Sequence, residues 1–294
     1  MNSSGIKIRW ITTTCFEIVL PNGKVIVLDP WVGKEHPMHP GVSVDTGFSV
    51  DDFTGADYIF LSHTHFDHIA DLLELLGKKQ TDPCGGHVFL PALSAKLFSD
   101  VYDVPLVNLI PVYPYETFEL DDIIVTPLPC RHFGDKGVNV AERPGECRQK
   151  AAARGEDLRY HESMEMGSLE EMDLAITVKS CNFRFMVLGG RVYRFQNIYK
   201  WAEEFHPDFV IRQVSNGFTP EDYADIVKRF HAPVVFPSHH DLHHLELAQN
   251  MSYEAYFGRV NQLLKEEKSS VRVVNIKPCT WYQVGTVCQE ANAE

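Results

Sequence analysis

Three histidines and one aspartate fall within six consecutive positions of the stretch FLSHTHFDHIADLLELL. The pattern H-x-H-x-D-H is formed by His63, His65, Asp67 and His68. Imidazole nitrogens and carboxylate oxygens are good ligands for zinc, iron and manganese. If the strand continues past Ser62, His63 and His65 point to the same side, because side chains alternate along a strand. The pattern predicts a metal site, with solvent-facing loop histidines as the alternative.

Two more histidines follow predicted strands far from this motif. His132 lies in PLPCRHFG, and His239 lies in VVFPSHHD. Functional residues of α/β folds gather at strand ends. Each histidine alone could be a polar loop residue, but together with the motif both are predicted to be metal ligands.

The pattern of apolar residues predicts an α/β fold. Predicted strands span residues 6–11, 15–20, 24–29, 57–62, 87–91, 123–129, 174–180, 183–190, 208–215, 232–238, 271–276 and 281–284. Predicted helices span residues 92–99, 194–205, 219–231 and 253–265, and a further helical pattern at 69–76 is closed by Gly77. Asn22 and Gly23 between two strands predict a hairpin. The two halves resemble each other, so residues 1–294 are predicted to form a single mixed α/β domain.

Residues 134–171 differ in composition from the rest of the chain. They are rich in charge, Gly, Ala and Met, and poor in apolar periodicity. Long segments of this kind inside a domain are often lids or binding loops. The segment is therefore predicted to be an insertion and a lid, with a disordered surface excursion as the alternative.

Composition excludes several classes of protein. Hydrophobic residues make up 44% of the 294 residues, which supports a large core and disfavours disorder. The net charge of −13 disfavours broad binding to nucleic acid. We find no signal peptide and no apolar run long enough for a membrane span. The seven cysteines are scattered and form no CxxC pair, so a reduced, cytoplasmic chain is predicted.

The sequence resembles the metallo-β-lactamase superfamily, in the branch that includes ascorbate-6-phosphate lactonase and many metal-dependent hydrolases. HTHFDH matches the signature motif of that family, and CFEIVLPNGKVIVLDPWVG, PDFVIRQVSNG and FPSHHD resemble other segments of the branch. The resemblance covers most of the chain outside residues 134–171. It implies a four-layer αββα sandwich of two mixed sheets with helices outside and metals at one sheet edge.

The resemblance also implies two sets of ligands for one or two divalent ions. The first metal would be held by His63, His65 and His132. The second would be held by Asp67, His68 and His239. Zinc and manganese are the expected ions, with iron as an alternative.

One position departs from the family pattern. The family usually has Gly-Asp after the second hairpin, and that Asp bridges the metals. Here the stretch is VLGGRVYR, with Gly190 or Arg191 at the expected position. The resemblance therefore implies a weaker second site. Arg191 is predicted to bind an anionic group of a small-molecule substrate, with a salt-bridged surface arginine as the alternative.

An open, His-rich metal site is suited to hydrolysis. The predicted reaction is attack of a metal-bound hydroxide on a carbonyl or phosphoryl centre. Asp67 would bind the metal and orient that hydroxide. The predicted proton donor is His240, with His161, His243 and His244 as alternatives.

The branch suggests a lactone or a phosphorylated sugar acid as substrate. A phosphodiesterase of the same superfamily is a second interpretation, and a degenerate metal-binding protein without hydrolase activity is a third. Redox chemistry at a di-iron site ranks last, because it needs extra carboxylate ligands and a flavin domain.

Overall fold

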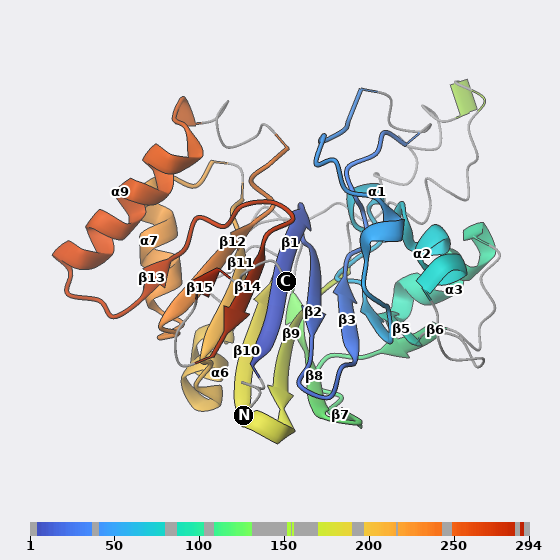
Figure 1. The fold of residues 1–294 in the computed structure, drawn as a ribbon, viewed down its shortest axis with the longest axis horizontal. Helices are drawn as coiled ribbons and strands as arrows, with labels where there is room; N and C mark the ends of the chain where they lie inside the picture. Colours follow the sequence, from blue (N-terminus) through green and yellow to red (C-terminus); the bar gives the residue numbers. More distant parts are fainter. Residues whose placement is uncertain are drawn as a thin grey trace.

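Two β-sheets form the centre of the molecule. The computed structural model describes residues 5–36, 41–79, 87–102, 109–130, 152–153, 155, 170–189, 197–215, 217–242, 249–285 and 289–290. Within them, strands assemble into one sheet of eight strands and one of seven. Helices lie on the outer side of each sheet (Figure 1). The predicted αββα layering is confirmed.

The first sheet combines an antiparallel half with a parallel half. Its order is β15 (Gln289–Glu290), β14 (Trp281–Val284), β1 (Ile6–Thr12), β2 (Cys15–Val19), β3 (Val25–Leu28), β4 (Tyr58–Phe60), β5 (His87–Pro91) and β6 (Leu109–Val112). Neighbours from β15 to β3 pair antiparallel, and those from β3 to β6 pair parallel. The predicted hairpin joins β2 to β3, where Gly23 takes a positive φ of 85° that suits glycine.

The second sheet has the same mixed character. Its order is β13 (Arg272–Val273), β12 (Val234–Ser238), β11 (Phe209–Gln213), β10 (Phe183–Leu188), β9 (Glu171–Val178), β8 (Ile123–Cys130) and β7 (Phe118–Leu120). Strands β10 to β13 run parallel, and β7 to β10 pair antiparallel. The predicted second hairpin joins β9 to β10 through the short 3-10 turn η3 (Lys179–Cys181) and Asn182, whose φ is 48°.

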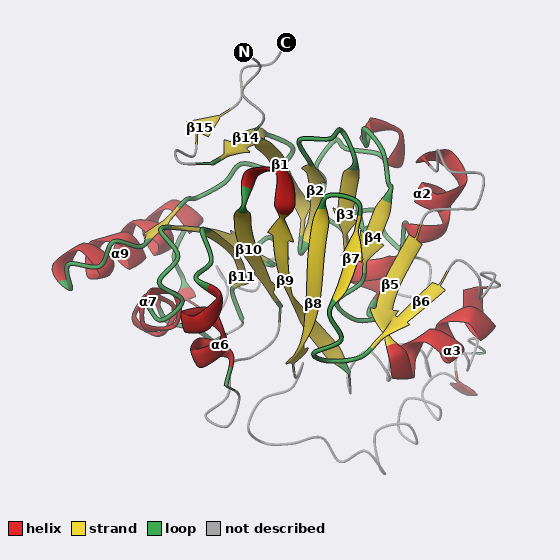
Figure 2. Ribbon diagram, turned by 90° about the horizontal axis from the view of Figure 1, so that it is seen from below, coloured by secondary structure: helices red, strands yellow, loops and turns green. Residues whose placement is uncertain are grey.

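Three apolar clusters hold the four layers together. The largest lies between the sheets and joins Phe16 and Phe60 of the first sheet to Ile176 and Phe185 of the second. Another joins the first sheet to η1 (Val50–Asp52), α1 (Phe66–Ile69), α2 (Leu72–Lys79) and α3 (Ala92–Tyr102). The last joins the second sheet to α6 (Ile198–Phe205), α7 (Pro220–Lys228) and α9 (Tyr253–Glu266). Figure 2 shows the two groups of helices on opposite sides of the sheets.

The segment around the histidine motif differs from its prediction. The strand predicted at 57–62 ends at Phe60, because the backbone N–H of Ser62 donates to the Asp29 carboxylate (2.6 Å) rather than to a neighbouring strand. The motif therefore lies on a loop and on α1, not on a strand. His65 is the residue just before α1.

The helical pattern at 69–76 is divided into two helices. The N–H of Asp71 donates to the carbonyl of Pro30 (3.0 Å), which ends the first helix, and α2 begins at Leu72. The prediction that Gly77 closes the segment is wrong, because α2 continues to Lys79. The helix predicted at 219–231 ends earlier than expected, at Lys228.

Most of the predicted insertion lies outside the described residues. Of 134–171, the structure describes 152–153, 155, 170 and 171. Glu171 pairs with Cys130 as the first residue of β9.

Strands β6, β7 and β15 have no counterpart among the predicted strands.

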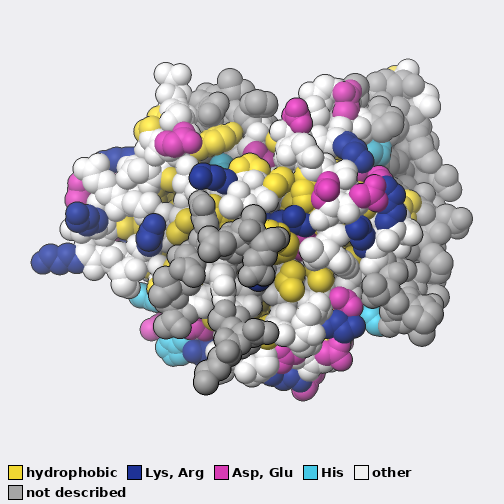
Figure 3. Space-filling model, in the orientation of Figure 1, with side chains coloured by type: hydrophobic (Ala, Val, Ile, Leu, Met, Phe, Trp, Pro, Cys, Tyr) yellow, Lys and Arg dark blue, Asp and Glu magenta, His cyan; other side chains and the backbone are white. Residues whose placement is uncertain are grey.

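Acidic and basic side chains are interspersed on the described part of the face in Figure 3. Within the described ranges, no helix combines the length and the apolar character that crossing a membrane requires.

Candidate metal centre

The ends of strands from both sheets meet at one edge of the sandwich. Asp29 directly follows β3, the histidine motif follows β4, and His239 directly follows β12. The N–H of His239 donates to the carbonyl of Thr13, just past the end of β1 (2.8 Å), which ties the two sheets together there. Figure 1 shows α1 at the same edge as the tip of β1. The topology thus brings together segments that are more than 170 positions apart.

Three predicted ligands converge at this edge, and we call Asp67, His68 and His239 the metal centre. One possible donor atom from each lies within 4.8 Å of the others. Asp67 Oδ2 lies 3.2 Å from His239 Nε2 and 3.6 Å from His68 Nε2. Donors at about 2.0–2.2 Å from a common zinc ion would be at most about 4.4 Å apart. The two distances from Asp67 Oδ2 lie below this limit, and the chemistry of the three donors fits a divalent metal ion.

His68 is held in an orientation that suits a metal ligand. Its Nδ1 lies 2.8 Å from Asp29 Oδ2 and 2.7 Å from Thr14 Oγ1. A carboxylate only accepts hydrogen bonds, so Nδ1 carries the proton that Asp29 accepts. Nε2 then faces Asp67 and is the nitrogen that would bind a metal ion after losing its proton. A carboxylate behind a ligating histidine fixes the ring and strengthens the ligand in this way.

Asp29 and Thr14 contact His68 and were not among the predicted site residues. Asp29 is 2% exposed and also accepts from Thr14 Oγ1 (2.6 Å) and from the backbone N–H of Ser62 (2.6 Å). Its φ of 42° is uncommon outside glycine. The sequence signal for Asp29 is its place as a charged residue at the end of the apolar run KVIVLD.

The charges of the metal centre are strongly coupled. Burial alone would raise the pKa of Asp67, but the imidazoles of His68 and His239 outweigh it and hold that pKa well below its ordinary value. Burial alone would lower the pKa of His68, but Asp67 and Asp29 outweigh it and raise the pKa to about 9. Without metal, Asp67 is ionised and His68 is protonated at neutral pH. The pair thus forms an ionic contact that a metal ion would replace.

The other two motif histidines lie beside the metal centre. The rings of His63 and His65 are 4.5 Å apart between centroids, and His63 lies 4.0 Å from the ring of His68. His63 Nδ1 is 3.0 Å from Ser62 Oγ. The structure therefore brings together two of the three residues predicted for the first ion. The third, His132, lies outside the described residues.

His240 has surroundings unlike those of the metal centre. Its ring stacks on Trp10 at 4.6 Å and meets the edges of Tyr253 (5.0 Å) and Phe257 (5.2 Å). The side chain is 2% exposed, and burial lowers its pKa to about 4. A neutral imidazole enclosed by aromatic rings favours a packing role over proton transfer. Five other residues of interest lie outside the described residues: His161, Gly190, Arg191, His243 and His244.

Replacing Asp29 with asparagine should weaken metal binding. The amide keeps the shape of the side chain but loses the charge that orients His68, and losing such a partner typically costs about 10–100-fold in metal affinity. The measurement is zinc affinity by competition with a coloured chelator. Asp57→Asn is the control, since Asp57 pairs with Lys24 away from the centre. Equal affinities in the wild type and the Asp29 variant would contradict the assigned role.

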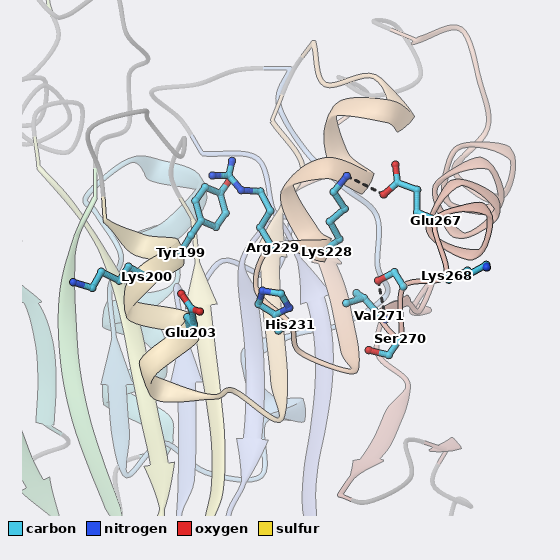
Figure 4. A pocket seen from close by; sticks show the side chains of 11 residues that line it. Tyr199, Lys200, Glu203, Lys228, Arg229, His231, Glu267, Lys268, Ser270 and Val271 are labelled. Carbon is cyan, nitrogen blue, oxygen red and sulfur yellow. Dashed lines mark hydrogen bonds and ion pairs between the residues drawn. The ribbon is translucent and has the colours of Figure 1, made fainter.

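A cavity of about 610 Å³ lies elsewhere, between α6, the end of α7 and residues 267–271 (Figure 4). Two of its basic groups are engaged: Lys228 pairs with Glu267 at 2.8 Å, and the Arg229 guanidinium lies 3.6 Å from the ring centre of Tyr199. His231 lines this cavity and lies three residues before β12 begins at Val234. His239 follows the other end of that strand. The two ends of this five-residue strand are four steps of about 3.3 Å apart, or about 13 Å. This cavity therefore does not belong to the metal centre.

The curated proteins that this chain resembles are named metal-dependent hydrolases. A UPF0173 metal-dependent hydrolase of Polaromonas sp. (strain JS666) is 26% identical over 276 residues, which is 92% of this chain and 87% of the relative. Another from Solibacter usitatus is 36% identical over 78 residues, which is 26% of this chain. That match spans only 29% of the relative's length.

Solved structures share the fold of this chain at low sequence identity. Igni18, a metallo hydrolase of the archaeon Ignicoccus hospitalis, matches with a TM-score of 0.60 and 16% identity over 98% of this chain and 99% of that one. A possible metal-dependent hydrolase of Veillonella parvula matches with a TM-score of 0.63 and 13% identity over 96% of this chain and 100% of that one. At these identities the likeness shows the fold alone.

The family is shown by a match over most of the chain. The family model described as "Beta-lactamase superfamily domain" matches residues 24–240. This range begins just before β3 and ends just after His239, so it includes all three residues of the metal centre. The chain belongs to the β-lactamase superfamily.

Proposed function

We propose that this protein is a metal-dependent hydrolase whose active site is the metal centre. The observation that carries the proposal is the convergence of Asp67, His68 and His239, with His68 oriented by Asp29. Such a site, with imidazole and carboxylate ligands and no cysteine, is typical of catalytic rather than structural metal sites. The names of the relatives, metal-dependent hydrolases, support the same activity.

The side chains divide the work of this proposed site. A divalent ion held there would lower the pKa of a coordinated water and polarise a carbonyl or phosphoryl oxygen. Asp67 stays ionised across the neutral range, so its carboxylate can accept a hydrogen bond from a group beside the ion. His68 would hold the ion through Nε2, while its Nδ1 donates to Asp29. His63 and His65 are placed to extend the donor set, with His132 as their predicted companion.

The proposal also names a class of substrate and an ion. Resemblance to the ascorbate-6-phosphate lactonase branch supports a small lactone or phosphorylated sugar acid, with Arg191 as the residue that would bind its anionic group. A phosphodiester is the alternative substrate, and zinc or manganese is the proposed ion, with iron as the alternative. The four described cysteines, Cys15, Cys130, Cys181 and Cys279, are free thiols, which supports the proposed cytoplasmic location.

Removing and restoring metal tests the activity directly. The protein should hydrolyse at least one member of a panel of lactones, phosphodiesters and sugar-acid phosphate esters. A chelator followed by dialysis should abolish that activity, and added zinc or manganese should restore it, because the attacking water depends on the ion. Activity that survives complete loss of metal would contradict the proposal. A protein that binds metal but hydrolyses nothing would support the degenerate metal-binding alternative instead.

A further inference from the structure

The turn between β1 and β2 contacts backbone groups of the metal centre. Strand β1 ends at Thr12 and β2 begins at Cys15, so Thr13 and Thr14 form the turn. Thr13 is fully buried there. Its hydroxyl, its carbonyl and its N–H each make a hydrogen bond to a segment that carries a proposed metal ligand, as follows.

The hydroxyl of Thr13 holds the peptide group that joins two of the ligands. Thr13 Oγ1 donates to the backbone carbonyl of Asp67 (2.9 Å). This carbonyl belongs to the same peptide group as the N–H of His68, and that N–H donates to the carbonyl of His65 (3.0 Å). The peptide group between Asp67 and His68 is therefore fixed at its oxygen and at its nitrogen.

The Asp67 carbonyl is available to Thr13 because helix α1 is short. In a continuing α-helix, the N–H of residue 71 would donate to the carbonyl of residue 67. Here the N–H of Asp71 donates to the carbonyl of Pro30 instead (3.0 Å). Backbone carbonyls in buried segments need a hydrogen-bond partner, and Asp67 is buried. The Thr13 hydroxyl supplies the partner that the helix does not.

The main chain of Thr13 reaches the third ligand. Its carbonyl accepts from the N–H of His239 and from Trp10 Nε1, both at 2.8 Å. Its N–H donates to both carboxylate oxygens of Asp241, at 2.9 Å and 3.1 Å, two residues after His239. One residue of the first sheet thus fixes the loop of the second sheet that carries His239.

The backbone of Thr13 has a conformation that threonine rarely adopts. Its φ is 39°, in the left-handed region, where a β-branched residue is an outlier. Strained residues of this kind persist where the surrounding structure imposes them, and they cluster at functional sites. Glycine would adopt this conformation with less strain, but it has no hydroxyl. The presence of threonine here indicates a use for its side chain.

We propose that Thr13 is a positioning residue of the metal centre. It holds the Asp67–His68 pair and His239, which come from different sheets, at the spacing that one divalent ion requires. The inference rests on the proposed function, because it requires that the centre binds a metal ion. Thr13 acts through the backbone of the ligands, and groups that orient ligands in advance raise metal affinity.

Cobalt binding to a matched pair of variants tests this role without any substrate. Metal-free protein is titrated with Co²⁺, and visible absorption reports both affinity and coordination. Thr13→Val removes the hydroxyl and keeps the shape of the side chain. It should lower the affinity about tenfold and change the absorption bands, since groups behind the ligands contribute about 10–100-fold.

Thr12→Val is the control for this pair. It makes the same change at the neighbouring position, which is also fully buried. The hydroxyl of Thr12 makes no hydrogen bond within the part of the chain that the structure describes. The affinity and the bands of this variant should match those of the wild type.

Two further variants separate positioning from folding. Thr13→Ser keeps the hydroxyl and should bind Co²⁺ as the wild type does. Thr13→Gly relieves the strain at the positive φ but should still lose about tenfold in affinity, and it decides the question if Thr13→Val does not fold.

The outcomes distinguish this inference from the proposed function. Wild-type bands and affinity in folded Thr13→Val or Thr13→Gly would overturn the inference and leave the proposed function intact. A Thr13→Ser variant that binds as weakly as Thr13→Val would also overturn it. A wild-type protein that binds no Co²⁺ would overturn both.

Discussion

Replacing Asp67 with asparagine is expected to lower the affinity for a divalent ion by more than about a hundredfold, because partners behind the ligands already contribute about 10–100-fold. Asp67 is the carboxylate of the metal centre, and Oδ2 faces both imidazoles. An amide at this position is neutral and a weaker metal ligand. Activity should fall with the metal content.

Folding should survive this substitution. Thr13 Oγ1 donates to the backbone carbonyl of Asp67 (2.9 Å), and this contact does not depend on the side chain. Metal per chain is measured by elemental analysis after dialysis, and the thermal midpoint reports folding. Asp225→Asn, which breaks an exposed ion pair with Lys228, is the control and should keep full metal content. A folded Asp67 variant with wild-type metal content would show that the centre is misassigned.

Metal affinity is expected to rise about a hundredfold between pH 6.5 and pH 8.5. The raised pKa of His68, about 9, means that the free protein carries a proton on this ring throughout that range. Metal binding must release the proton, so affinity increases about tenfold for each pH unit and levels off only above the pKa. An ordinary histidine, with a pKa near 6.5, would give little change above pH 7.

Calorimetry gives an independent count of that proton. Metal titrations at pH 7.5 in buffers of different ionisation enthalpy should show about one proton released for each ion bound. Asp29→Asn should reduce the released fraction, because it removes one of the carboxylates that hold the proton on His68. Affinity that is flat from pH 7 to pH 8.5, with no proton released, would contradict the assigned ion contact between Asp67 and His68.

The histidine motif and the elements near it could be predicted from local sequence. The spacing of His63, His65, Asp67 and His68 is short, so one loop and one helical turn bring them together in any compact fold. The hairpin turn at Asn22 and Gly23 is local for the same reason, since Leu20 pairs with Lys24 around a three-residue loop and Gly23 takes the positive φ that such a loop favours. The strand predicted at 57–62 was too long, because a distant side chain takes a backbone N–H that would otherwise pair within the sheet. Asp29 accepts from the N–H of Ser62 and thereby ends the strand before the motif.

The partners of the motif could be decided only by the tertiary structure. Residue types suggested His239 as a ligand, but its placement beside Asp67 depends on β12 ending next to the turn after β1, more than 220 positions away in the chain. Asp29 carries no local pattern that marks a metal site. Its contact with His68 comes from burial at a shared sheet edge, where low exposure makes a carboxylate costly unless a histidine, an arginine or a metal ion lies beside it. The sequence by itself determined which atoms could bind a metal; the packing of two sheets decided which of them meet.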